Sequence, residues 1–267
     1  LVFRNPRPPD TEVFQAYAQD HYGTSRLETL FEAQVELYRP KARLLRRWLA
    51  AGPEIRVVEV GSFVGGFLAA GQEYSWNMLG IDPGEEVDAF CRGKGLHVFR
   101  GTLSEASLET NSIDCVAIWN TFDQLPYPDP TLTAARRVLR PGGIMAVRVP
   151  NGVCFRLVVA WTRRLPRPLR GWLRAALAWN NLLAFPYLYG YSVRTLDALF
   201  SRFDLQRVFV QPDTLTRLAD AQTKTWAAWE ESMLKLFWRF AARLDALRLR
   251  GALAVAPWVD AYYRLPD

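Results

Sequence analysis

The chain has 267 residues, of which 50% are hydrophobic and 22% are charged. This composition excludes an intrinsically disordered chain and is typical of a globular protein with a large core. The net charge of +6 is concentrated locally, because residues 151–196 contain seven Arg and no Lys, Asp or Glu. Such a basic segment favours an anionic substrate, a membrane surface or a nucleic-acid backbone as its partner.

The three cysteines, Cys91, Cys115 and Cys154, match no zinc motif and imply no disulfide framework, so we expect no metal site. A reducing cytoplasm is the compartment that this cysteine usage favours. No apolar stretch approaches the roughly 20 residues that a membrane-spanning helix needs.

At the start of the chain, residues 1–10 are polar and Pro-rich, and we expect a mobile arm. Ser25 and Glu28 have the spacing of a capping box, which predicts a helix that runs to about Trp48. Pro40 lies inside that pattern and should kink or split the helix.

Short apolar runs then alternate with helical patterns. The predicted strands are residues 55–60, 78–81, 96–99, 113–119 and 144–149, and the predicted helices are 67–74, 85–92 and 129–139. This alternation predicts an α/β fold, Rossmann-like and doubly wound, with a mostly parallel sheet. The Arg-Pro-Gly-Gly sequence at residues 140–143 predicts a helix stop and a sharp turn.

After residue 150 the pattern changes. We expect a helical insertion rich in Arg and aromatic residues over 151–190, a helix over 192–203, a strand over 205–210 and an amphipathic helix over 222–249. Residues 252–264 fit either a closing strand or a short helix. The chain thus divides into an N-terminal arm with helices (1–52), a cofactor-binding core (53–150), an insertion (151–190) and a C-terminal part (191–267). The first and third parts would act as lids.

The strongest motif is the turn after the first predicted strand. Gly61 and Gly65 lie where the strand must reverse into a helix, and glycines there let the backbone approach a ligand. Asp82 follows Gly61 by 21 residues, at the distance where an acid can accept hydrogen bonds from ribose hydroxyls. Phe63 replaces the glycine that a pyrophosphate would need. The turn therefore favours a cofactor with adenosine and without a pyrophosphate, and argues against an NAD-dependent oxidoreductase.

Together these motifs resemble the class I S-adenosylmethionine-dependent methyltransferase family of the small-molecule type, as in methyltransferase types 11, 12 and 23. Glu59, Gly61 and Gly65 match its first motif, and Asp82 matches its second acid. Residues 112–116 resemble the family's entry into the fourth strand, and residues 135–143 resemble its helix and turn before the fifth. The resemblance covers residues 30–150.

The resemblance implies that S-adenosyl-L-methionine is the cofactor and S-adenosyl-L-homocysteine the product. It implies that Glu59 orients the methionine ammonium through water, Asp82 holds the ribose and Asn120 lies beside the methionyl part. The remaining cofactor contacts that it implies are Gly61, Ser62, Phe63, Gly65, Pro83, Thr102 and Leu103, the last two beside the adenine. Thr102 stands where the family commonly has an acid.

The expected reaction is in-line methyl transfer to an O, N or C atom of a small organic acceptor, in which positioning supplies most of the catalysis. The candidate catalytic residues are Asp123, Gln124 and His21. Gln124 stands where the family often has a His. Asp123 is the nearest acid–base candidate, although a surface turn acid is an equal interpretation. His21 lies in a segment that could fold over the cofactor, whereas His97 is expected to be structural.

Two alternatives remain at this point. Phe63, Thr102 and Gln124 are also compatible with a non-catalytic, methyltransferase-like binding module. Residues 163–179 place apolar side chains (Leu165, Leu169, Trp172, Leu173 and Ala176) on one helical face and Arg163, Arg167, Arg170 and Arg174 on the other. This is typical of peripheral membrane contact, and so of a membrane-associated methyltransferase with a lipid-like acceptor, or of a lid with a solvated basic face. Nucleic acid is not expected, because the aromatics do not lie among the Arg residues.

Overall fold

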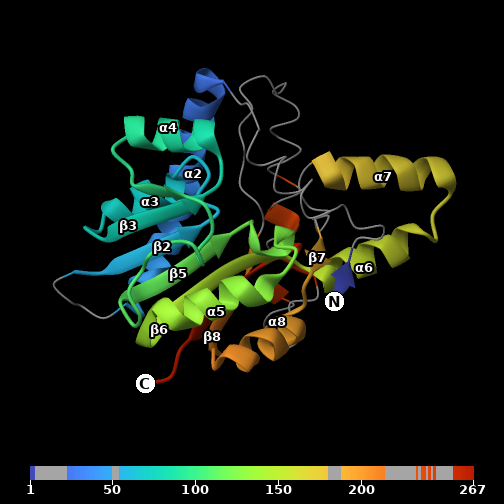
Figure 1. Ribbon diagram of the computed structural model, residues 1–267. Coiled ribbons are helices and arrows are strands. Elements are labelled where there is room, and N and C mark those ends of the chain that lie inside the picture. Colours follow the sequence, from blue (N-terminus) through green and yellow to red (C-terminus); the bar gives the residue numbers. More distant parts are fainter. Residues whose placement is uncertain are drawn as a thin grey trace.

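The computed structural model describes residues 1–3, 23–49, 54–179, 188–213, 255–267 and positions 233, 236–238, 240, 241, 243 and 244. Its centre is a seven-stranded sheet with the order β4-β3-β2-β5-β6-β9-β8 (Figure 1). The strands are β2 (Arg56–Val60), β3 (Asn77–Asp82), β4 (Val98–Arg100), β5 (Ile113–Trp119), β6 (Leu139–Pro150), β8 (Gln206–Asp213) and β9 (Trp258–Arg264). β2 to β6 pair in parallel, and β9 pairs antiparallel with both β6 and β8.

Helices cover both faces of this sheet (Figure 1). The helices are α2 (Thr24–Leu45), α3 (Gly66–Gln72), α4 (Glu85–Gly93), α5 (Pro128–Val138) and α8 (Val193–Phe200). One core joins α2, α3 and α4 to the sheet through Tyr38, Phe67 and Cys91, and the other joins α5 and α8 through Leu132 and Phe200. The predicted α/β, Rossmann-like fold with a mostly parallel sheet is confirmed, and residues 252–264 contain the closing strand, β9.

The first helix differs from its prediction. α2 begins at Thr24 with Gly23 as its N-cap and no side-chain cap, so the expected capping box of Ser25 and Glu28 is wrong. The amide of Gly23 instead donates to Glu86 Oε1 at 2.9 Å, which ties the helix start to α4. Pro40 does not split the helix. Buried side chains on both sides of it, Val35 and Ala42 among them, hold one continuous helix against the core.

The helix stop predicted at residues 140–143 is confirmed, since α5 ends at Val138. The segment belongs to β6, but Gly142 has a left-handed φ of +73°, so the chain turns here within the strand. The amide of Gly142 donates to the Leu265 carbonyl at 2.9 Å, and the Leu265 amide donates to the Gly143 carbonyl at 2.9 Å. The irregularity that the glycines predict survives as a bulge, which shifts the register against β5 between Ile113 and Cys115.

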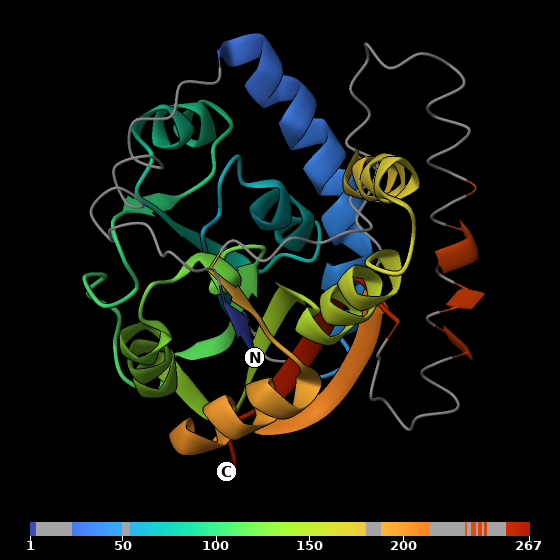
Figure 2. The ribbon, with the colours of Figure 1, turned by 90° about the vertical axis from the view of Figure 1, so that its right-hand side faces the viewer.

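The insertion contains two helices, α6 (Gly152–Thr162) and α7 (Arg167–Trp179), that project from one end of the molecule (Figures 1 and 2). Leu165 lies between them rather than in a helix, so its predicted place on the apolar face is wrong. Arg174 is not on a solvated face either. Its Nε donates to Thr162 Oγ1 at 2.8 Å and its Nη2 donates to the Val159 carbonyl at 3.1 Å, so Arg174 joins α7 to the end of α6.

Near the N-terminus, residues 2 and 3 form a short strand, β1 (Val2–Phe3), paired with β7 (Tyr189–Gly190), so the expected mobile arm is wrong for these two positions. The rest of that arm, with His21, lies outside the described residues, as does most of the predicted helix 222–249. Within the described ranges, no helix combines the length and hydropathy needed to cross a bilayer.

Candidate active site

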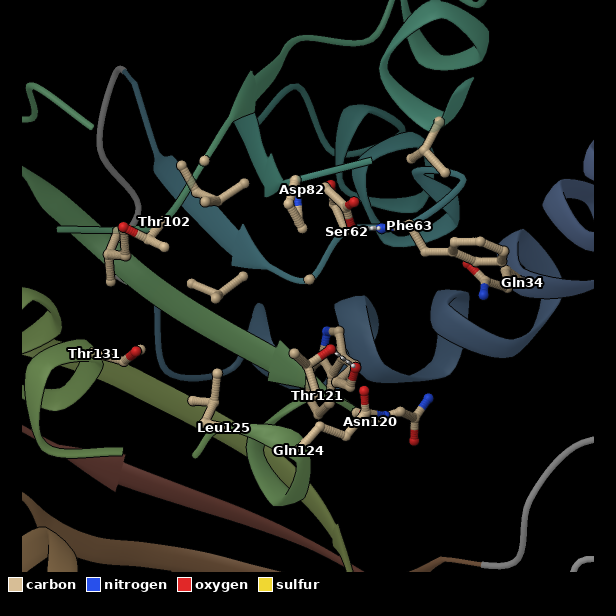
Figure 3. A pocket seen from close by; sticks show the side chains of 18 of the residues that line it. Gln34, Ser62, Phe63, Asp82, Thr102, Asn120, Thr121, Gln124, Leu125 and Thr131 are labelled. Carbon is tan, nitrogen blue, oxygen red and sulfur yellow. Dashed lines mark hydrogen bonds between the residues drawn. The ribbon is translucent and has the colours of Figure 1, made fainter. Parts of the chain in front are cut away.

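A pocket of about 390 Å³ opens where the strand order reverses, at the carboxyl ends of β2 and β5. Open α/β sheets bind ligands at this switch point, and the volume lies within the range of about 300–1,000 Å³ that is usual for small molecules. Figure 3 shows Ser62, Phe63 and Asp82 on one side of it and Asn120, Thr121 and Gln124 on the other. Nine predicted site residues line the pocket: Gly61, Ser62, Phe63, Asp82, Pro83, Thr102, Leu103, Asn120 and Gln124.

The turn after β2 is built from residues with left-handed backbones. Gly61 has a φ of +74°, and a Cβ there would lie 2.1 Å from Thr121 Oγ1. Phe63 has a φ of +45°, although it is not a glycine. The side chain that departs from the family pattern therefore does not change the path of the turn. The turn still presents backbone groups to the pocket.

Asp82 fixes this turn as well as facing the pocket. Its Oδ2 accepts a hydrogen bond from the Phe63 amide at 2.8 Å, and its Oδ1 accepts one from the Gly84 amide at 2.9 Å. Burial raises the pKa of this carboxyl, and the two amide hydrogen bonds oppose that change. Each oxygen has a second acceptor site, so the side chain can bind a pair of hydroxyl groups without releasing the turn.

Glu59 lies at the base of the same turn, in the last residues of β2, and does not itself line the pocket. It is 1% exposed, and its Oε2 has no hydrogen-bond partner among the described residues. Burial, with a contribution from the nearby Asp82, holds its pKa well above the usual range. A cationic group at this end of the pocket would favour the ionised form. The unpartnered Oε2 of Glu59 is therefore suited to a nearby cationic group.

Asn120 follows β5 with a φ of +59°, a conformation that Asn tolerates better than most residues. Its Nδ2 donates to the Tyr38 hydroxyl at 3.4 Å, and its Oδ1 accepts from Arg148 Nη1 at 2.9 Å. Both ends of the amide are thus held. The pocket wall beside Asn120 is fixed from α2 on one side and from β6 on the other.

The three candidate catalytic residues separate in the structure. Gln124 lines the pocket, and its Nε2 donates to the Asn120 carbonyl at 2.6 Å. Asp123, its neighbour in a 3₁₀ turn, is 3% exposed and does not line the pocket, because adjacent residues of such a turn point in different directions. The interpretation of Asp123 as a surface turn acid is therefore wrong. His21 cannot be compared, since it lies outside the described residues.

Two further predicted residues have structural surroundings. Gly65 caps α3 with a left-handed φ of +77°, a conformation that favours glycine. Thr102 donates through its amide and its Oγ1 to Glu105 Oε2, each at 2.8 Å. These hydrogen bonds lower the pKa of Glu105. An acid is therefore present next to Thr102, one turn further along the chain than the family pattern places it.

The sequence motifs did not indicate several residues of the site that lie far from them in the chain. Gln34 and Tyr38 reach the pocket from α2, and only the core-facing helical spacing of Tyr38 could have indicated it. Arg148 is 0% exposed and lies near the carboxyl end of β6. The sequence signal that could have indicated Arg148 is a charged residue inside a predicted buried strand, because a buried charge needs partners.

Arg148 belongs to a buried ionic network that supports the pocket from behind. Its Nε lies 3.0 Å from Asp213 Oδ2, and Lys41 bridges Asp213 and Asp260. Burial raises the pKa of Asp260, while Lys41 and Arg148 oppose that change. Two cations and two carboxylates balance, so the network adds no net charge to the site.

The comparisons with known proteins agree with this geometry. A family model described as a methyltransferase domain matches residues 31–210. A protein of Mycolicibacterium smegmatis described as a probable S-adenosylmethionine-dependent methyltransferase is 26% identical over 140 residues, which are 52% of this chain and 49% of that relative. The chain spans between 26% and 49% of the length of the curated relatives that it matches.

Two solved structures share the fold. A methyltransferase from Archaeoglobus fulgidus, described as dependent on S-adenosylmethionine, has a TM-score of 0.54 at 16% identity, covering 96% of this chain and 100% of that one. Phosphoethanolamine N-methyltransferase 2 of Haemonchus contortus, in complex with S-adenosylmethionine, has a TM-score of 0.58 at 12% identity, covering 96% and 60%.

The chain therefore belongs to the methyltransferase-domain family. This confirms the predicted family, the enzyme class and S-adenosylmethionine as the cofactor of the domain. The pocket fits that group, since the unpaired acid Glu59, the glycine turn and Asp82 offer partners for an ammonium and for ribose hydroxyls.

Proposed function

We propose that this protein transfers the methyl group of S-adenosylmethionine to an O, N or C atom of a small organic acceptor. The observation that carries the proposal is the pocket at the switch point, where the glycine turn, Asp82 and the Asn120 wall meet above the buried acid Glu59. In this proposal Asp82 holds the ribose hydroxyls, Glu59 orients the methionine ammonium through a water molecule, and Thr102 and Leu103 lie beside the adenine.

The cofactor supplies a methyl already activated on a sulfonium, so the protein's own task is to hold the acceptor in line with it. Asn120 and Gln124 present amide groups that can orient a polar acceptor, and the Tyr38 hydroxyl stands beside Asn120. Among the described lining residues Asp82 is the one carboxylate and there is no histidine. We therefore assign no general base, and Asp123 stays outside the mechanism.

The test is methyl transfer itself. Purified protein is incubated with methyl-labelled S-adenosylmethionine and panels of small hydroxyl, amine and activated-carbon acceptors, and label in the acceptor is measured. We expect transfer to one acceptor class, and at least about a tenfold loss of rate in Asn120→Ala, because an acceptor held less well reacts more slowly. The matched control is Asn77→Ala, an exposed amide of β3 outside the pocket.

The alternative of a non-catalytic binding module gives a different result. Cofactor would bind, but no acceptor class would take up label above that found with heat-denatured protein. Failure to bind cofactor at all would contradict both readings of the pocket.

A further inference from the structure

The α6–α7 hairpin (residues 152–179) holds together through few internal contacts. Cys154, Val158 and Leu177 form a small buried cluster, against which Leu173 and Trp238 pack. No described residue of the hairpin lines the pocket. Contact with the cofactor pocket therefore does not explain why the hairpin projects from the molecule.

Large apolar side chains on the hairpin face solvent. Leu157 is 51% exposed, Trp161 55%, Leu169 46% and Trp172 67%. A folded monomer seldom gathers several such side chains on one projecting element unless that element meets a partner or a membrane.

Next to the hairpin, the described residues between 233 and 244 repeat the pattern. Met233, Phe237, Phe240 and Leu244 recur at helical spacing and are 49%, 64%, 62% and 37% exposed. Trp238 faces the other way, since it packs on the hairpin cluster and its Nε1 donates to the Val255 carbonyl at 2.8 Å. The exposed stripe thus lies beside the hairpin. We call the two together the apolar–basic surface.

The charge of this surface has one sign. Residues 151–196 and 233–244 contain no Asp or Glu. Arg156, Arg163, Arg164 and Arg167 are exposed beside Leu157 and Trp161. A second copy of this chain is a poor partner, because pairing this surface with itself would set Arg against Arg with no carboxylate between them.

We infer that the apolar–basic surface docks the protein on an anionic lipid bilayer. Tryptophan is suited to the boundary between headgroups and acyl chains, where Leu and Phe can bury their side chains. Arginine extends toward lipid phosphates while its stem covers apolar surface. The inference does not depend on methyl transfer, and it can be measured without cofactor.

The experiment is sedimentation of the full chain with vesicles of phosphatidylcholine alone, or of phosphatidylcholine and phosphatidylglycerol in equal parts, at low and high salt. We expect partition onto the anionic vesicles only, and its loss at high salt, because exposed charges are then screened. Arg163→Gln/Arg164→Gln/Arg167→Gln should lower partition by between about tenfold and about a hundredfold, since each of the three surface Arg contributes up to about fivefold. Trp161→Ala/Trp172→Ala should lower it to a similar extent.

The charge control is Arg26→Gln/Arg56→Gln/Arg92→Gln, which removes three exposed Arg from α2, β2 and α4, elements away from the hairpin (Figure 1), and should leave partition unchanged. Equal effects of the two triple variants would overturn the inference, as would equal binding to neutral vesicles. It would also be overturned if the wild type stayed in solution and Trp161→Ala/Trp172→Ala instead converted a dimer into a monomer in sedimentation velocity. All substituted side chains are exposed, and thermal unfolding of each variant confirms that it is folded.

Discussion

Phe63 has a left-handed backbone at a position where the family pattern has glycine. Its ring packs beside the core formed by α2, α3 and α4, and also lines the pocket. The residue thus combines a conformational cost with a contact that offsets it. The sequence indicated the departure from glycine, but only the coordinates show that the turn keeps its path, because the Phe63 amide is held by Asp82.

This strain can be measured by comparing Phe63→Gly with Phe63→Ala. Both variants lose the ring, so their difference reports the backbone alone. We expect Phe63→Gly to be more stable than Phe63→Ala by about 1 kcal/mol in urea unfolding, because glycine adopts positive φ freely. At an ordinary backbone position the order would be reversed, and that order would contradict the assigned conformation.

Glu59 predicts a dependence of stability on pH. Burial raises the pKa of this acid in the folded state, so the folded protein binds more protons than the unfolded chain between the unfolded and folded pKa values. The stability that protonated Glu59 contributes is full below the unfolded pKa and is lost as the pH rises through the folded pKa. Glu59→Gln removes this titration.

We therefore expect the stability of the wild type relative to Glu59→Gln to be greater at about pH 4.5 than at about pH 8, in urea unfolding without cofactor. Asp82 titrates in both proteins, so the difference reports Glu59 together with its interaction with Asp82. A difference that does not change with pH would show that Glu59 is not held in its protonated form.

At the scale of elements, α2 shows how tertiary packing overrides a local signal. The sequence predicted a kink or a split at Pro40, and the helix is not split, because buried residues on both sides of Pro40 are held by the same core. Proline there still lacks the amide that would bond to the Glu36 carbonyl, and its ring is exposed.

Pro40→Ala should accordingly stabilise the protein by about 1–3 kcal/mol in urea unfolding, because it supplies the missing amide without burying anything new. Arg43→Ala, an exposed change in the same helix, is the control and should alter stability by less than about 0.5 kcal/mol. Equal or lower stability of Pro40→Ala would mean that the helix is bent around the proline in a way that alanine does not relieve.

The elements that the sequence predicted well are those whose signal is local. β5 was predicted at its observed bounds, Ile113–Trp119, because a continuous apolar run is typical of a strand buried on both faces. The helix stop and the glycine irregularity at residues 140–143 were predicted, but the hydrogen bonds of this segment to Leu265, more than 100 residues away, were not. The contribution of Tyr38 to the pocket was missed for the same reason. Contacts between segments that are distant in the chain are not encoded in a local sequence pattern.

At the scale of the whole molecule, the binding pocket and the apolar–basic surface lie in different places. The pocket lies at the switch point between β2 and β5, and the apolar–basic surface lies on the projecting hairpin and the residues beside it. The sequence motifs predicted the position of the pocket, since glycines and an acid at fixed spacing are typical of a ligand-binding turn. Composition indicated the basic character of the apolar–basic surface, but only the structure shows that Trp161 and Trp172 face solvent.

The central claim is that the pocket binds S-adenosylmethionine through Asp82, and titration calorimetry with S-adenosylhomocysteine tests it most directly. The account predicts binding at one site, weakened by at least about tenfold in Asp82→Ala because the ribose partner and the anchor of the Phe63 amide are lost together. Asp129→Ala, an exposed acid paired with Arg202 and outside the pocket, should bind as the wild type does. No heat of binding at about 1 mM ligand, or equal affinity of the wild type and Asp82→Ala, would contradict the account.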